Sequence, residues 1–194
     1  MNKLSALIIA ALLLVLSGCG PSKVKSMKEI ATLEKNLYSG QGMNFNKARA
    51  DSLLNQYIRF VKRFPKDTLA PKYLFQAAGL AMTMGDGKKS MALYDDFILK
   101  FPDNPKAPVC LFFKGYIYEN LIANYDKAKE TYLLFLEKYP DNEFSKDARV
   151  ALMNIGKTPE QLVREFEDKQ KAENVRVSDS IASAKGKKPA KARN

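Results

Sequence analysis

A short aromatic phrase that ends in proline occurs three times in this chain. Its copies are Phe60-Val61-Lys62-Arg63-Phe64-Pro65, Phe97-Ile98-Leu99-Lys100-Phe101-Pro102 and Phe135-Leu136-Glu137-Lys138-Tyr139-Pro140. They recur at intervals of 37 and 38 residues, and a tyrosine stands three residues before each copy. Offsets of three and seven share one face of a helix, and proline cannot continue a helix. Each copy is therefore predicted to be the buried stripe of a helix, and the period predicts stacked helical hairpins.

Between the copies, the sequence predicts a partner helix for each hairpin. Apolar and small residues recur there at helical spacing: Leu74, Ala78 and Ala81 within residues 70–84, and Leu111, Gly115 and Tyr118 within residues 107–120. The small side chains of Ala78 and Gly115 allow the two helices of a hairpin to approach closely. The segments 85–87 and 124–126 are rich in turn-forming residues and are predicted to join the paired helices.

The two ends of the array depart from this pattern. Residues 28–38 and 46–64 can form a first hairpin, and residues 144–155 are predicted to form a helix after the third. Thr158-Pro159-Glu160-Gln161 is typical of a helix start, with a capping threonine, an early proline and a capping-box glutamine. The next helix carries an apolar face formed by Leu162, Val163 and Phe166. We expect that face to shield the end of the stack from water.

The N-terminal segment indicates export. Residues 4–16 form an almost uninterrupted apolar run after a cationic start, too short for a membrane-spanning helix and typical of a signal peptide. The sequence Leu16-Ser17-Gly18-Cys19 resembles the lipobox of bacterial lipoproteins, in which the cysteine becomes the lipid-bearing first residue. The resemblance implies a signal peptide over residues 1–18, a lipidated tether over 19–26, and, with Gly20 after the cysteine, transport to the outer membrane. An ordinary signal peptide with an incidental Cys19 is the alternative.

The repeats resemble the tetratricopeptide repeat, whose pattern places a small residue, an aromatic residue, an alanine, a second aromatic residue and a proline at fixed spacing. In the third unit these five places are occupied by Gly115, Tyr118, Ala128, Tyr132 and Pro140, and Leu111 lies one helical turn before Gly115. The longer period and the repeated Pro-Asp-Asn are similar to the BamD-like group of outer-membrane assembly factors, which have more repeats than this chain. The resemblance covers residues 25–168 and implies an all-α, superhelical array of antiparallel helix hairpins, with residues 27–168 as the repeat domain.

In tetratricopeptide arrays the first helix of each hairpin lines a concave groove that binds peptide segments. Transferred to this chain, the resemblance implies that this groove is lined by Lys72, Phe75, Met82, Thr83, Phe112, Tyr116, Glu119, Asn120, Val150 and Asn154. The peptide-binding residues expected among them are Phe75, Met82, Phe112, Tyr116, Glu119 and Asn120. Aromatic anchors with polar neighbours are typical of binding hot spots. Packing between hairpins is an equally good interpretation of Phe75, Phe112 and Tyr116, and Glu119 and Asn120 could merely end their helix.

Much of the net charge of +11 lies in the C-terminal segment. Residues 169–194 contain eight Lys and Arg, two acidic residues and no aromatic residue, and we expect a disordered tail after a frayed helical start. Such a tail is either a solubilising extension or a contact with anionic lipid, lipopolysaccharide or an acidic partner.

Several classes of site are excluded or disfavoured by composition. The chain has no histidine, which excludes His-dependent triads and His-ligated metals. Cys110 lies among apolar residues, so a buried, inert thiol is expected. The segment from Ala151 to Thr158 matches a loose phosphate-binding loop, but a real loop needs a preceding strand and exposed amides. No cofactor, nucleotide, nucleic acid or metal is therefore expected.

These observations predict a non-enzymatic scaffold on the periplasmic face of the outer membrane, anchored through Cys19. Through the BamD-like resemblance, the expected partners are envelope proteins, among them the β-barrel assembly machinery and unfolded outer-membrane proteins. The first alternative is a repeat adaptor for another envelope process, such as peptidoglycan coordination or cell division. The second, an enzyme or nucleotide-binding protein, depends on the Gly156-Lys157-Thr158 match.

Overall fold

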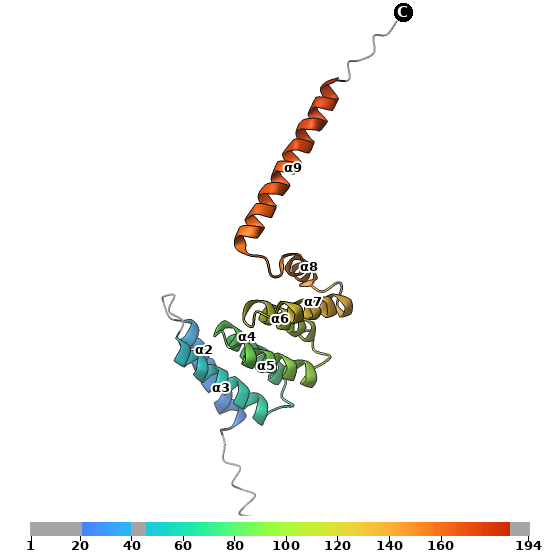
Figure 1. Ribbon diagram of the computed structural model, residues 1–194. Coiled ribbons are helices and arrows are strands. Elements are labelled where there is room, and N and C mark those ends of the chain that lie inside the picture. Colours follow the sequence, from blue (N-terminus) through green and yellow to red (C-terminus); the bar gives the residue numbers. More distant parts are fainter. Residues whose placement is uncertain (1–20, 40–45, 187–194) are drawn as a thin grey trace, which may run out of the picture.

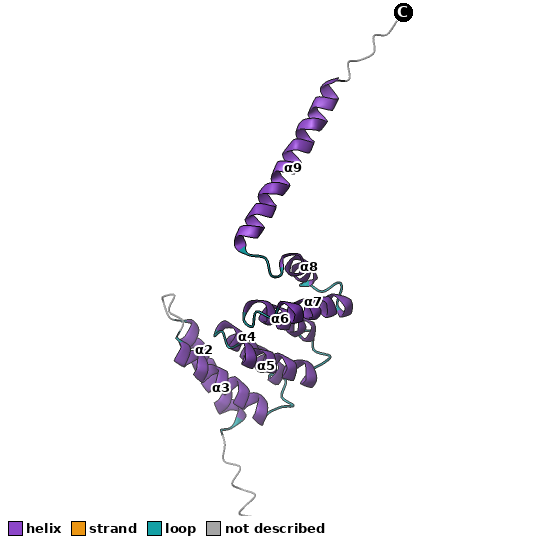
Figure 2. Ribbon diagram, viewed as in Figure 1, coloured by secondary structure: helices purple, strands orange, loops and turns teal. Residues whose placement is uncertain are grey.

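The computed structural model describes residues 21–39 and 46–186 of the chain, and within these ranges it contains helices and loops but no strand (Figures 1 and 2). The helices are α2 (Lys23–Tyr38), α3 (Lys47–Arg63), α4 (Ala70–Thr83), α5 (Gly87–Lys100), α6 (Ala107–Asn120), α7 (Tyr125–Lys138), α8 (Ser145–Asn154) and α9 (Pro159–Gly186). Each helix from α2 to α8 packs chiefly on its neighbours in the chain, which makes three hairpins and one further helix. The all-α hairpin array is confirmed.

The recurring phrases are the inner faces of the second helices, α3, α5 and α7. The first phenylalanine of each copy and the tyrosine three residues before it are at most 1% exposed: Tyr57, Phe60, Tyr94, Phe97, Tyr132 and Phe135. The last aromatic residue of each copy is the C-cap of its helix, directly before the proline. The predicted stripes and stops are therefore confirmed, because the aromatic side chains supply the apolar area and the proline ends the helix.

Side-chain caps start α3, α5 and α7. Asn46, Asp86 and Asn124 each accept a hydrogen bond from the backbone N–H three residues later, at 3.0, 3.0 and 3.1 Å. Gly85, directly before the cap of α5, has a φ of 77°, a left-handed conformation that glycine adopts without strain. These local features fold residues 83–87 and 120–125 into the turns that the sequence predicts.

The apolar interior consists of two adjoining clusters. The larger joins α2 to α6, and the smaller is formed by Phe112, Ala128, Tyr132, Phe135 and Ala148 of α6 to α8. Phe113 and Tyr118 pack against both clusters, so the interior continues along the array.

The beginning of the first hairpin differs from the prediction. Helix α2 starts at Lys23 rather than at residue 28, because the side chain of Ser22 accepts a hydrogen bond from the backbone N–H of Lys25 at 3.3 Å. Residues 23–26, expected to be tether, are therefore helical. Cys19 and the signal segment lie outside the described residues.

The end of the chain also differs. Helix α9 extends away from the array (Figure 1) and continues to Gly186, where a disordered tail was expected from residue 169. Leu162, Val163 and Phe166 are 37%, 57% and 62% exposed, so the expectation that they shield the stack is wrong. Ile155 has an extended backbone and Gly156 a positive φ, and these two residues turn the chain out of the array after α8. Residues 187–194, the most basic part of the expected tail, lie outside the described ranges.

Among the described helices, none has the length and apolar character that crossing a bilayer requires.

Candidate functional site: a pocket between α4 and the start of α6

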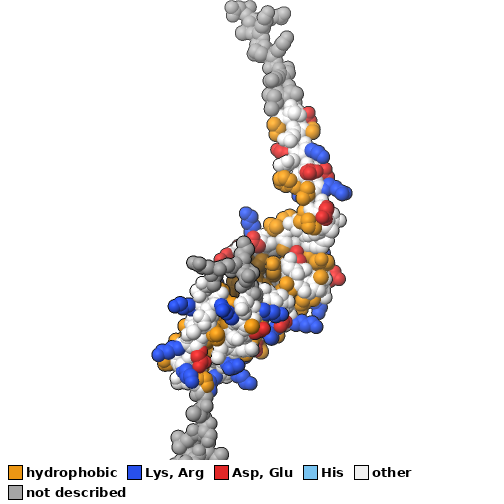
Figure 3. Space-filling view, turned by 90° about the vertical axis from the view of Figure 1, so that its left-hand side faces the viewer, with side chains coloured by type: hydrophobic (Ala, Val, Ile, Leu, Met, Phe, Trp, Pro, Cys, Tyr) orange, Lys and Arg blue, Asp and Glu red, His pale blue; other side chains and the backbone are white. Residues whose placement is uncertain are grey.

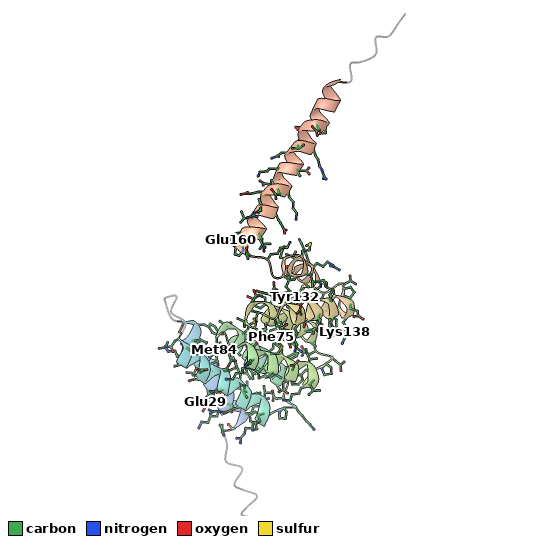
Figure 4. The ribbon with its side chains drawn as sticks, viewed as in Figure 1. Glu29, Phe75, Met84, Tyr132, Lys138 and Glu160 are labelled. Carbon is green, nitrogen blue, oxygen red and sulfur yellow. The ribbon has the colours of Figure 1, made fainter. Side chains whose placement is uncertain are left out.

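A pocket of about 320 Å³ lies between the second and third hairpins. Its lining comes from the loop before α4, from α4, from α5 and from the loop that leads into α6: Thr68, Pro71, Lys72, Phe75, Gln76, Phe97, Asn104 and Lys106. Figure 4 shows Phe75 in the middle of the array, between Glu29 of the first hairpin and Tyr132 of the third. The pocket therefore combines side chains that only the stacking of two hairpins brings together.

Phe75 forms the aromatic floor of this pocket and is held by rings from both hairpins. Its ring centroid lies 6.0 Å from that of Tyr94, 5.9 Å from that of Phe97 and 6.4 Å from that of Phe113. The contacts with Tyr94 and Phe97 are edge-to-face, an arrangement that aromatic quadrupoles favour. Phe75 is only half-buried. Both interpretations of this residue thus hold in part, since it packs between hairpins and still presents a surface to the pocket.

Two lysines flank Phe75. The ammonium group of Lys106 lies 5.6 Å from the centroid of the Phe75 ring, and that of Lys72 lies 5.8 Å from the centroid of Tyr73. Both side chains are exposed, and neither forms an ion pair with any carboxylate in residues 21–39 or 46–186. The pocket therefore offers two cations to an incoming anionic group.

The amide of Gln76 adds a polar group to the wall of the pocket. Its side-chain oxygen is buried and accepts no hydrogen bond within the described part of the chain. A buried acceptor without a donor costs about 1–3 kcal/mol, and the side chain of Gln76 would have to rotate before this oxygen could meet a ligand. An aromatic floor and two cations suit an extended peptide that carries an acidic side chain.

The structure places the other predicted groove residues elsewhere. Met82 is half-buried and packs against the larger core cluster. Glu119 accepts a hydrogen bond from the hydroxyl of Tyr132 at 2.9 Å and so joins α6 to α7. Tyr116 and Asn120 are exposed, and the Asn120 side chain donates to the Tyr116 carbonyl at 3.0 Å. None of these four side chains lines the pocket with Phe75.

The expectation that Phe112 is an exposed groove residue is wrong. It is 8% exposed and is a member of the smaller core cluster. Its ring stacks on that of Phe144 at a centroid distance of 4.8 Å, and it also packs on Tyr132 and Phe135. Phe144 precedes α8, so Phe112 is buried by the unit that follows it.

Of the residues that line the pocket, Lys72 and Phe75 are among the groove residues that the sequence predicts, whereas Gln76 and Lys106 are not. Gln76 follows Lys72 by one helical turn, and this spacing could have revealed it. Lys106 is 31 residues from Phe75 in the chain, and only the packing of one hairpin on the next brings them together.

The segment that matches a phosphate-binding loop has a different architecture here. Helix α8, and not a strand, precedes Gly156, and Thr158 and Gln161 form a reciprocal cap at the start of α9. Lys157 donates a hydrogen bond to Glu165 at 2.8 Å, and this bond lowers the pKa of the Glu165 carboxyl. The segment therefore acts as the junction between α8 and α9.

Cys110 is fully buried, as predicted, and its burial raises the pKa of the thiol to about 12. Only the thiolate is a strong nucleophile, so this cysteine is inert at neutral pH. Within the described residues, no group of three or more Cys, Asp or Glu side chains is arranged to hold a metal ion.

Comparison with known protein families supports the repeat assignment. Residues 111–142, which span most of α6 and all of α7, match the family described as Tetratricopeptide repeat. A comparison with curated proteins gives no match. The chain thus contains a tetratricopeptide repeat, and its fold is an all-α hairpin array of the kind that serves protein–protein interaction.

Proposed function

We propose that this chain is a non-enzymatic scaffold that binds a segment of another protein in the pocket between α4 and α6. The observation that carries the proposal is the placement of Lys72 and Lys106 beside the half-buried ring of Phe75. An acidic side chain of the bound peptide can pair with these lysines. The proposed function therefore involves binding and no chemical step.

The cellular setting of the proposal rests on the sequence. The lipobox-like segment ending at Cys19 supports a lipid anchor, and the Pro-Asp-Asn repeats are similar to those of BamD-like assembly factors. We therefore place the scaffold at the periplasmic face of the outer membrane, in the assembly of outer-membrane β-barrel proteins. Its partners there are the β-barrel insertase and unfolded barrel chains.

Co-purification from detergent-solubilised envelopes tests this function. Three proteins are compared: the parent, the pocket variant Lys72→Glu with Lys106→Glu, and a control with Lys88→Glu and Lys129→Glu. The control makes the same charge change at two exposed lysines outside the pocket. We expect the parent and the control to recover the large β-barrel insertase, and the pocket variant to lose at least 90% of it.

Other outcomes separate the parts of the proposal. Equal recovery with all three proteins contradicts the pocket as the binding site. Recovery of cell-wall or division proteins alone contradicts the assembly role and favours the adaptor for another envelope process.

The anchor has its own test. Cys19→Ala removes the proposed lipidation site without changing any described helix. We expect the variant to leave membranes that are washed at high salt, which screens electrostatic contacts, whereas continued fractionation under that wash contradicts lipid attachment at this residue.

A further inference from the structure

We propose that the solvent face of the first hairpin, α2 and α3, is a docking surface for the anionic phospholipid surface beside the anchor. The face is defined by Lys25, Lys28 and Lys35 of α2 and Arg49 of α3, which we call the basic face. The inference goes beyond the peptide pocket and rests on the proposed function only for the position of the anchor.

The hairpins of the array differ sharply in charge. Helices α2 and α3 carry nine Lys and Arg against three Asp and Glu. Helices α6 and α7 carry four of each sign. Figure 3, which faces the left-hand side of Figure 1, shows blue basic side chains over the lower part of the array and orange apolar ones around the base of α9. A positive excess in one hairpin attracts an anionic surface to that end of the molecule.

The basic side chains lie on the outward side of α2. This helix packs chiefly on α3, and its opposite stripe contains Val24, Lys28, Lys35 and Tyr38 at spacings of four, seven and three residues. Val24 and Tyr38 are 61% and 71% exposed. A tyrosine with an exposed ring is well suited to the boundary between headgroups and acyl chains, and lysines beside it can pair with phosphates.

Two shallow hollows follow the line between α2 and α3 on this face. One, of about 410 Å³, is lined by Lys25, Lys28 and Thr32 among others, and the second, of about 460 Å³, includes Arg49 and Ser52. Leu33 lines both hollows, so they adjoin. The acidic residue among their linings, Glu29, already accepts a hydrogen bond from Gln56 at 3.2 Å. The hydroxyls of Thr32 and Ser52 donate to backbone carbonyls of their own helices, so what the hollows present to a lipid phosphate is the cations of Lys25, Lys28 and Arg49.

The lysines of the basic face are available for such contacts. Lys23 pairs with Asp67, but Lys25, Lys28 and Lys35 are exposed and form no ion pair with any carboxylate in the described ranges. Lipid phosphates can therefore pair with these lysines without breaking an existing ion pair.

The chain itself limits the distance between anchor and basic face. Three residues lie between Cys19 and the start of α2 at Lys23, and an extended chain spans at most about 14 Å over these four Cα–Cα steps. This span is an upper limit and exceeds the Debye length of about 8 Å at physiological salt, so the lysines of α2 feel the lipid charge where the helix lies along the surface. This position favours lipid over an acidic protein as the occupant.

Vesicle co-sedimentation tests the inference without the lipid anchor. The protein is the chain from Gly20 to Asn194, which contains every described helix. The vesicles consist of phosphatidylethanolamine alone or of phosphatidylethanolamine in which about one lipid in three is anionic phosphatidylglycerol. The test variant carries Lys25→Gln, Lys28→Gln and Lys35→Gln. The matched control carries Lys88→Gln, Lys129→Gln and Lys146→Gln, three exposed lysines of α5, α7 and α8.

We expect the parent to bind only the vesicles that contain phosphatidylglycerol, with an affinity that falls as salt is raised. A basic residue near an anionic surface contributes about fivefold, so the triple variant of α2 should lose about 100-fold and the control less than fivefold. Equal losses in both variants, or binding that is independent of phosphatidylglycerol, overturn the inference. Binding lost only when Lys185, Lys187 and Lys188 are changed to Gln also overturns it, because the C-terminal segment is then the contact.

The result is separable from the proposed anchor. If the unlipidated chain binds vesicles through α2 and the Cys19→Ala variant still fractionates with membranes, this inference is supported and the lipid anchor is contradicted. Loss of Cys19→Ala from membranes, with no vesicle binding by the unlipidated chain, keeps the anchor and removes the inference.

Discussion

The first and third hairpins share one internal contact and differ on their outer surfaces. In the first, the hydroxyl of Tyr57 donates to Glu34 at 2.7 Å, and in the third that of Tyr132 donates to Glu119 at 2.9 Å. In both, the tyrosine belongs to the second helix and the glutamate to the first. Burial first, and then this hydrogen bond, raise the pKa of both tyrosines.

Outside, the two hairpins have little in common. The first is strongly basic, as its count of charged side chains shows. The third is balanced in charge and exposes large apolar side chains: Tyr116, Tyr125, Leu133 and Leu134. The interior of each unit thus specifies the fold, while the outer surface is free to differ and determines what each end of the array can contact.

The largest expected effect concerns the shared interior. Phe60→Ala and Phe135→Ala each remove a ring that is at most 1% exposed, and should lower the free energy of unfolding by about 3–5 kcal/mol. Leu134→Ala, beside Phe135 but 39% exposed, should cost less than about 1 kcal/mol. Urea unfolding followed by circular dichroism measures all three. A Phe135→Ala protein as stable as the Leu134→Ala control would show that the third hairpin lacks the interior described here.

A second prediction separates the outer hairpins from the middle one. Tyr57→Phe and Tyr132→Phe remove a hydrogen bond to a carboxylate, and each should cost about 2 kcal/mol. Tyr94→Phe is the matched change in the middle hairpin, where no carboxylate in the described residues bonds to the tyrosine, and it should cost less than about 0.5 kcal/mol. The same urea titrations apply, and three equal costs would contradict a special role for the tyrosine–glutamate pairs.

Two glycines sharpen the comparison further, because alanine should act with opposite sign at each. A Cβ at Gly115 would lie 2.7 Å from ring carbons of buried Tyr132, so Gly115→Ala should destabilise by about 1–2 kcal/mol. At Gly79 the nearest atom is the Tyr94 hydroxyl at 3.8 Å. Gly79→Ala should therefore stabilise by about 0.5–1 kcal/mol through helix propensity. Thermal unfolding that shifts in the same direction for both would refute the close α6–α7 approach.

A smaller, pH-dependent effect is expected where the first hairpin meets the loop between α3 and α4. The hydrogen bond with Lys23 lowers the pKa of Asp67, so the ionised pair stabilises the folded chain above the ordinary carboxyl range. This contribution should be complete above the ordinary carboxyl pKa of about 4 and should be lost as the pH falls below it, through the lowered pKa of folded Asp67. Lys23→Gln should therefore be less stable than the parent at pH 6 and equal to it near pH 2, in urea titrations across that range. A stability difference that persists unchanged at the acid end would contradict this role of the pair.

The sequence predicted those parts of the fold that local chemistry determines. Aromatic spacing, proline stops and capping side chains such as Asp86 and Asn124 act within one or two helical turns, so they can be recognised without coordinates. The start of α2 was placed too late because Ser22, its cap, precedes a polar stretch without an apolar stripe.

Contacts between units could not be predicted in the same way. Phe112 and Phe113 are adjacent in the sequence and both contact Phe144, at centroid distances of 4.8 and 5.9 Å, and only the packing of the helices leaves Phe112 the more buried. The apolar face of α9 suggests packing, but the backbone at Ile155 and Gly156 directs that helix away from the array. The pocket was predicted only through Lys72 and Phe75, because Lys106 reaches it from the next hairpin.

Site-specific photo-crosslinking tests most directly whether the array binds protein between its second and third hairpins. A photoreactive residue replaces Lys72 in the pocket or, as a control, exposed Lys129 of α7, and adducts are identified from intact envelopes. We predict that position 72 yields an adduct with the β-barrel insertase or an outer-membrane barrel chain, and that Lys106→Glu reduces its yield at least tenfold. An adduct from position 129 alone, or one from position 72 that Lys106→Glu leaves unchanged, would contradict binding in this pocket.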